Sequence, residues 1–65
     1  MTLYTKDDCS RCDMIKDKLN SKGVSFNEIK DEEIIISLGI DFLPVLEVDG
    51  ELLDLGKANN YINSL

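Results

Sequence analysis

Two cysteines separated by two residues are the side chains in this sequence best suited to chemistry. Cys9 and Cys12 are the only cysteines among 65 residues, and the chain has no histidine. Because thiolates are both nucleophiles and metal ligands, the pair suits either disulfide exchange or metal binding. A disulfide between them closes a loop of only four residues, which adds little chain-entropy stabilisation. We therefore interpret the pair as chemical rather than structural.

The cysteines stand where a predicted strand passes into a predicted helix. The run 2–5 is β-prone, and a helical pattern follows the polar loop after it. Cys9 falls at the helix N-terminus, where unpaired N–H groups and the helix dipole favour a thiolate. Cys12 lies one turn further on, in an apolar stripe with Ile15 and Leu19, so we expect it to be more buried. Cys9 should attack a substrate disulfide, and Cys12 should resolve the resulting mixed disulfide.

Charged residues around the pair act in opposite directions. Lys6 and Arg11 bring positive charge to the thiolate, and we assign both to substrate binding. Asp7, Asp8 and Asp13 oppose them. We therefore expect the surroundings of Cys9 to favour its thiolate form, but not to an extreme degree.

The remaining patterns predict the elements that position the pair. A strand, a helix and a strand within thirty residues form a βαβ unit, whose strands should be parallel. Asp49-Gly50 is a hairpin turn signal, and the apolar cluster Ile34–Leu38 should belong to the core. The fold class is α/β, in the order β-α-β-α-β-β-α, with a four-stranded mixed sheet flanked by three helices. The predicted elements are the strand 2–5, a helix from 10 to about 22, the strand 24–29, a helix over 31–38, the strands 45–48 and 51–53, and a helix from about 56 to 64.

The only proline, Pro44, directly precedes a predicted strand. We expect this strand to run parallel to the first one and to begin beside the loop that holds Cys9. A proline has no N–H group to give to the sheet, which matters little at a strand's first residue. We expect the Leu43–Pro44 bond to be cis, to form one wall of the active site, and to leave the Leu43 backbone free for a substrate.

The segment Tyr4–Cys12 resembles the active-site segment of glutaredoxins, which also place a lysine three residues before the first cysteine, as Lys6 does here. Leu43-Pro44-Val45 stands where that family carries a cis-proline, and the resemblance of pattern covers essentially the whole chain. It implies a thioredoxin-like fold and a thiol–disulfide oxidoreductase, with Cys9 as nucleophile and Cys12 as resolving thiol. It also implies that Pro44 lies against the disulfide.

The resemblance further implies partners. The electron donor would be glutathione or thioredoxin reductase, and the substrate a protein disulfide, such as that of a ribonucleotide reductase, or a glutathione mixed disulfide. No cofactor beyond the redox-active Cys9–Cys12 disulfide is implied. The chain departs from the family by carrying Phe42-Leu43 where glutaredoxins usually have Thr-Val. It also has Asp54-Leu55-Gly56-Lys57 where they usually hold glutathione with Gly-Gly and Asp.

The composition of the chain limits the partners that it can bind. With 7 basic and 13 acidic residues, the net charge of −6 argues against nucleic acid and anionic membranes as partners. We expect one domain over residues 1–65, with neither a secretory leader nor a membrane span, acting as a cytoplasmic monomer.

The alternative function is that of a non-catalytic binding module that shares a metal between two chains through Cys9 and Cys12. One chain alone offers too few soft ligands for a tetrahedral zinc site, so we assign no metal.

Overall fold

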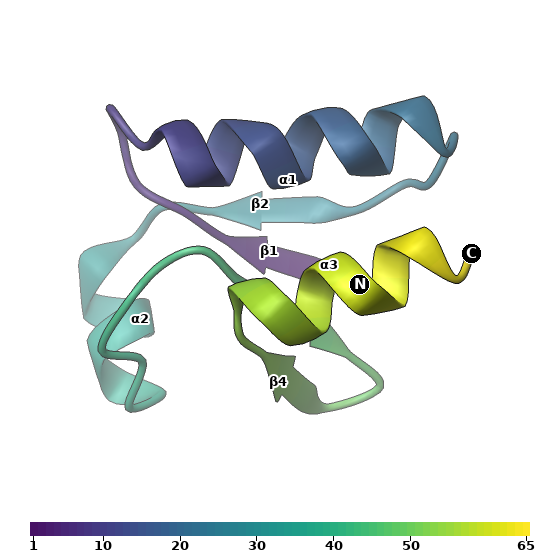
Figure 1. The fold of residues 1–65 in the computed structure, drawn as a ribbon. Coiled ribbons are helices and arrows are strands. Elements are labelled where there is room, and N and C mark those ends of the chain that lie inside the picture. Colours follow the sequence, from purple (N-terminus) through teal and green to yellow (C-terminus); the bar gives the residue numbers. More distant parts are fainter.

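The computed structural model describes residues 1–65 and contains the helices and strands in the predicted order (Figure 1). Each helix begins after a residue whose side chain accepts backbone hydrogen bonds, a common way of satisfying the free N–H groups of the first turn. The elements are β1 (Thr2–Tyr4), α1 (Ser10–Ser21), β2 (Asn27–Ile29), α2 (Glu32–Ser37), β3 (Val45–Val48), β4 (Glu51–Leu53) and α3 (Leu55–Asn63).

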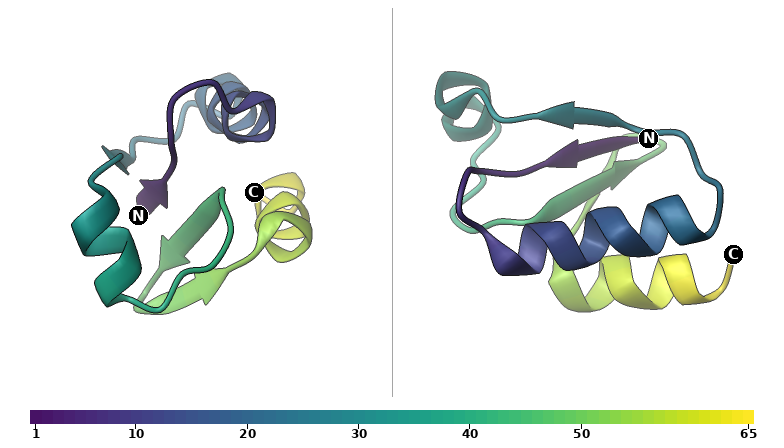
Figure 2. Two further views of the ribbon diagram at one scale, coloured as in Figure 1. Left: turned by 90° about the vertical axis from the view of Figure 1, so that its left-hand side faces the viewer. Right: turned by 90° about the horizontal axis from the view of Figure 1, so that it is seen from above.

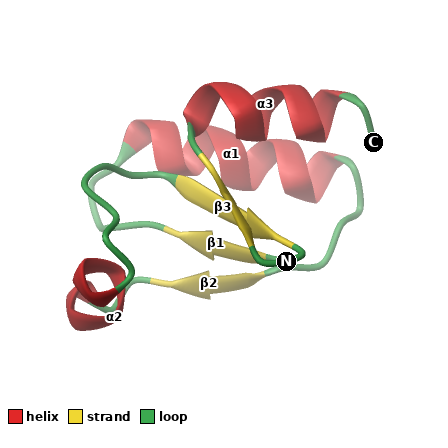
Figure 3. Ribbon diagram, turned by 90° about the horizontal axis from the view of Figure 1, so that it is seen from below, coloured by secondary structure: helices red, strands yellow, loops and turns green.

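The strands form one mixed sheet in the order β2-β1-β3-β4 (Figure 3). β1 and β2 are parallel, as a βαβ unit requires, whereas β3 and β4 form an antiparallel hairpin. The hairpin turns at Asp49 and Gly50, whose φ angles of 51° and 82° suit the sharp connection that this dipeptide predicts. The α/β class, the mixed four-stranded sheet and its three helices are therefore confirmed.

The orientation of β3 differs from the prediction. β3 runs antiparallel to β1, with Tyr4 opposite Val45, and not parallel to it. The chain stays at one end of the sheet between β2 and β3, with α2 at that end (Figure 3). A parallel strand would need a crossover back to the opposite end. The antiparallel orientation is what sets the start of β3 beside the end of β1, from which the chain continues toward Cys9.

Helices cover both faces of the sheet unequally. α1 and α3 lie side by side on one face, and α2 lies on the other side (Figure 2). The smaller core cluster, under α2, contains Tyr4, Ile35 and Val45. The larger cluster, between the sheet and the helix pair, contains Leu3, Ile15, Leu19, Leu46, Leu53, Ala58 and Ile62.

The prediction that Ile34–Leu38 belongs to the core is wrong for most of its residues. Only Ile35 is buried, whereas Ile34, Ile36 and Leu38 are 42%, 71% and 43% exposed. A helix of six residues with one face toward the sheet cannot bury consecutive side chains, because successive residues point about 100° apart. Apolar side chains are therefore left uncovered on α2.

Several boundaries also differ from the prediction: β1 ends at Tyr4 rather than at residue 5, and α2 covers Glu32–Ser37 rather than 31–38. β2 begins at Asn27 rather than at residue 24, because only three residues of β1 pair with it. The chain before it still completes the end of α1, since the Val24 N–H donates to the Leu19 carbonyl at 3.1 Å. α3 begins at Leu55 rather than Gly56 because Asp54 caps it. None of the helices is both long and apolar enough to span a membrane.

Candidate active site

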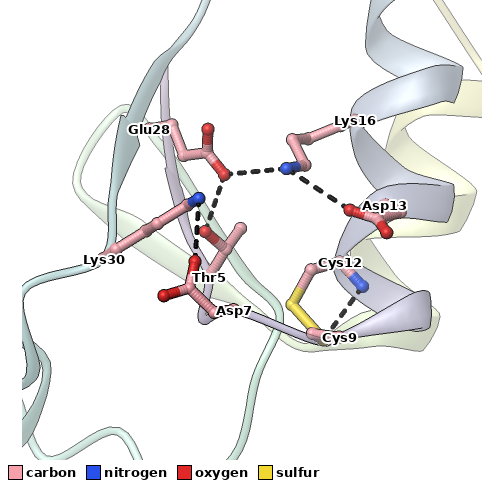
Figure 4. Close-up of polar contacts among 8 residues, drawn as sticks. All are labelled: Thr5, Asp7, Cys9, Cys12, Asp13, Lys16, Glu28 and Lys30. Atoms are coloured by element: carbon pink, nitrogen blue, oxygen red, sulfur yellow. Dashed lines mark hydrogen bonds and ion pairs between the residues drawn. A yellow bond between two sulfur atoms is a disulfide. The ribbon is translucent and has the colours of Figure 1, made fainter.

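The cysteine pair occupies the N-terminus of α1. Cys9 is the N-cap residue, with extended backbone (φ −120°, ψ 102°), and its Sγ accepts a hydrogen bond from the Cys12 N–H at 3.1 Å. The two cysteines form a disulfide, with their Cα atoms 5.2 Å apart (Figure 4). The first sulfur therefore lies at the positive end of the helix dipole, with a backbone donor directed at it.

The two sulfurs differ in access to solvent. Cys12 is completely buried, on the same stripe of α1 as Ile15 and Leu19, whereas Cys9 is half-buried. The predicted difference in burial is confirmed. An incoming disulfide therefore reaches Cys9 more readily than Cys12.

The loop before Cys9 has an unusual backbone at Asp8. Its φ of 53° is in the left-handed region, which residues other than glycine rarely adopt. Aspartate is among the side chains that tolerate this conformation best. This turn carries the chain from the end of β1 into the extended cap conformation of Cys9.

Beside the cysteines, a polar network joins the residue that follows β1 to β2 and α1 (Figure 4). The Thr5 hydroxyl, on a fully buried residue, donates to Glu28 Oε2 at 2.8 Å. Lys16 Nζ lies 3.1 Å from the same oxygen and 3.4 Å from Asp13 Oδ1. The Thr5 hydrogen bond, followed by that of Lys16, lowers the pKa of Glu28 below its ordinary value. Hydrogen bonding to Glu28, and secondarily to Asp13, raises the pKa of Lys16.

Sequence reasoning missed this network. Its only local signal is the pair Asp13 and Lys16, three residues apart on one face of α1. The partner Glu28 becomes apparent only from the parallel register, which pairs Leu3 with Glu28 and so brings Glu28 beside Thr5.

The structure places the two predicted cationic residues in different surroundings. Lys6 is exposed and lines a hollow together with Leu43. Arg11 is exposed on the first turn of α1 and does not line that hollow. Neither forms an ion pair. Asp7, which was expected to oppose them, is paired with Lys30 at 3.2 Å.

The Leu43–Pro44 bond is cis, as predicted. Pro44 is fully buried, and the pairing of Tyr4 with Val45 sets it beside Thr5, at the start of the loop that leads to Cys9. Neither the N–H nor the carbonyl of Leu43 forms a hydrogen bond within the chain. Both groups therefore lack a hydrogen-bond partner within the chain, at a residue that is half-buried.

No three side chains of the His, Cys, Asp and Glu types gather in a way that could hold a metal ion. The metal-binding alternative therefore needs ligands from a second chain.

Comparison with known proteins gives one match. The family model described as Glutaredoxin matches residues 1–53, a span that includes both cysteines and Pro44. No curated protein and no solved structure matches the chain.

Proposed function

The chain belongs to the glutaredoxin family, and from this premise we propose that it reduces disulfides by dithiol–disulfide exchange at Cys9 and Cys12. The observation that carries the proposal is the position of Cys9 at the N-cap of α1, more exposed than Cys12 and 3.1 Å from its N–H. A thiolate at this position is stabilised by the helix N-terminus and is open to attack a substrate.

In the reduced protein the reaction has two steps. The Cys9 thiolate attacks one sulfur of the substrate disulfide, forms a mixed disulfide and expels the other substrate sulfur as a thiolate. The Cys12 thiolate then attacks Cys9 Sγ, which closes the disulfide and releases the remaining substrate thiolate. The proton that Cys12 loses in this step balances the one that the first expelled substrate thiolate takes up. Two electrons pass from the dithiol to the substrate. Both released substrate thiolates become thiols when they are protonated.

The residues around the cysteines support a role in holding the substrate. The unpaired backbone groups of Leu43 suit pairing with an extended substrate segment, and Pro44 next to them shapes the wall beside the loop of Cys9. Lys6 and Arg11, which are free of ion pairs, add positive charge on the exposed side. This positive charge stabilises the substrate thiolate that is expelled.

We further propose a protein disulfide, such as that of a ribonucleotide reductase, as the substrate of a monomer acting in the cytoplasm. The electron donor is glutathione or thioredoxin reductase. Turnover with glutathione and glutathione reductase, compared with turnover with thioredoxin reductase, distinguishes the two donors. Asp54 stands at the place where glutaredoxins usually hold glutathione. Here its carboxylate accepts the Lys57 N–H at 2.9 Å as the cap of α3.

Reduction of insulin and of a glutathione mixed disulfide tests the proposal. The wild-type protein should reduce both, and Cys9→Ser should abolish both. Cys12→Ser should lose only the insulin reaction, because exchange with a glutathione mixed disulfide needs only the attacking thiol. Full activity of Cys9→Ser would refute the assignment. Absence of turnover, with one zinc ion bound per two chains, would favour the metal-sharing alternative.

A further inference from the structure

A hollow of about 370 Å³ opens between α2 and the segment that precedes β3. Lys6 and Leu43 are among its lining residues, and Ile36, Ile40 and Phe42 supply much of its apolar wall. Since Lys6 begins the loop to Cys9 and Leu43 precedes Pro44, the hollow adjoins the proposed substrate side of the cysteine pair. It is large enough for the bulky side chains of a protein segment.

The same segment also lines a second hollow, of about 260 Å³. Ile40 and Phe42 line both hollows, and the second also reaches Leu52 on β4. Ile36 is 71%, Phe42 60% and Leu52 40% exposed. The two hollows share residues 40–42 and together form a band of uncovered apolar side chains. Such a band, at the edge of a reactive site, is typical of a surface that binds another protein.

Three acidic and two basic side chains line the two hollows. Glu32 and Asp41 line the first hollow against Lys6. Asp41 also lines the second, with Asp54 and Lys57. The whole chain carries a net charge of −6. The net charge of the whole chain, together with this small local excess of acid, favours a cationic partner over an anionic one. Glutathione is a net anion at neutral pH, whereas a protein segment with lysine or arginine beside large apolar residues matches both properties of the surface.

We propose that the band formed by Ile36, Ile40, Phe42 and Leu52 binds a protein segment in which bulky apolar and basic residues flank the substrate disulfide. The proposal rests on the proposed function, since it names the kind of substrate on which Cys9 acts. Ile36 and Phe42 contact the apolar side chains of the segment, and Glu32 and Asp41 contact its basic ones. Disulfides in protein segments of this composition are thereby preferred over disulfides in acidic segments.

The test compares two synthetic peptides that contain the same intramolecular disulfide, flanked by Leu and Lys in one and by Ser and Glu in the other. Bis(2-hydroxyethyl) disulfide serves as a reference substrate without flanking residues. The second-order rate constant for oxidation of the reduced protein is measured with each. We expect the Leu/Lys peptide to react about tenfold faster than the Ser/Glu peptide, with a preference that weakens at high salt.

Variants locate the preference on the band. Phe42→Ser should lower the rate ratio between the two peptides severalfold, and Asp41→Asn should lower it in the same direction by removing charge complementarity. Both residues are exposed, so neither change should prevent folding. The matched controls are Leu65→Ser, at a leucine that is 49% exposed and lines neither hollow, and Glu51→Gln on β4. Both controls should leave the ratio unchanged.

The outcomes separate this proposal from the proposed function. Equal rates for the two peptides, or a ratio that Phe42→Ser leaves unchanged, would overturn the docking band while exchange at Cys9 stands. Failure of the reduced protein to react with either peptide or with the reference disulfide would overturn the exchange function itself, and the docking proposal with it.

Discussion

The hydroxyl of Thr5 donates to Glu28 Oε2 at 2.8 Å, and this bond fastens the last residue before the active-site loop to β2. Thr5 is fully buried and has no other side-chain partner. The same carboxylate holds Lys16 of α1 at 3.1 Å. One side chain of β2 therefore connects the start of the active-site loop to α1, the helix that begins at the cysteine pair.

Removing the hydroxyl should destabilise the protein. Thr5→Val keeps the shape of the side chain but leaves Glu28 without its buried donor, which should lower the free energy of unfolding by about 1–2 kcal/mol. Urea denaturation at neutral pH measures the change. The matched control is Thr2→Val, at the start of the same strand, where no side-chain hydrogen bond is lost and the change should stay within about 0.5 kcal/mol. Equal effects of the two substitutions would contradict the role given to Thr5.

Acid should weaken the same network. The Thr5 hydrogen bond and the Lys16 ion pair lower the folded-state pKa of Glu28 below its ordinary value of 4.5. The stabilisation is therefore present above that ordinary value and is lost as the pH falls through the lowered folded-state pKa. Urea denaturation at about pH 7 and about pH 3 should show that Glu28→Gln loses less stability on acidification than the wild-type protein does. Glu51→Gln, at a residue without an ion pair, should lose as much as the wild type. A wild-type loss matched by Glu28→Gln would exclude Glu28 as the source.

The left-handed backbone at Asp8 gives a prediction about the loop. Valine there should lower the free energy of unfolding by about 1–2 kcal/mol relative to glycine, because a β-branched side chain is strained at a φ of 53°. The same pair of substitutions at Asp7, whose φ is not positive, should lack this penalty. Thermal or urea unfolding of the four variants supplies the comparison. A valine–glycine difference as large at residue 7 as at residue 8 would contradict it.

Burial predicts the order in which the reduced thiols react. Cys12 is completely buried, whereas Cys9 is half-buried at the helix N-terminus. A limiting amount of iodoacetamide at neutral pH should therefore label Cys9 at least about tenfold faster, as measured by peptide mass spectrometry. In urea the two thiols should react at similar rates, which serves as the control. Faster labelling of Cys12 in the folded protein would reverse the proposed roles.

Local patterns in the sequence were enough to locate the cysteine pair. The strand-to-helix join, the N-terminal position of Cys9 and the burial of Cys12 all follow from residues 2–19, since adjacent elements and one helical stripe determine them. The cis bond before Pro44 was also predicted. Its prediction relied on a resemblance and on the position of the proline before a strand.

Features that depend on how distant elements meet were not predictable in this way. The orientation of β3 depends on where the chain re-enters the sheet after α2. The hydrophobic periodicity of the sequence does not contain this information. The exposure of Ile36 depends on how α2 meets the sheet, because the sequence shows an apolar residue but not whether a neighbour covers it. The bond from Thr5 to Glu28 joins residues 23 positions apart and requires the register of the β1–β2 pair. The two features beyond the cysteines that bear most on the site, the uncovered band and the polar network, are thus tertiary properties.

Trapping of the mixed disulfide tests the central claim most directly. Reduced Cys12→Ser is mixed with a protein disulfide substrate, quenched with acid and analysed by mass spectrometry after proteolysis without reductant. Because the resolving thiol is absent, a covalent adduct should accumulate through Cys9, whereas reduced wild-type protein should release the substrate and end with the Cys9–Cys12 disulfide. Absence of any adduct at Cys9 in the variant, or an adduct formed equally well by Cys9→Ser through Cys12, would contradict the account.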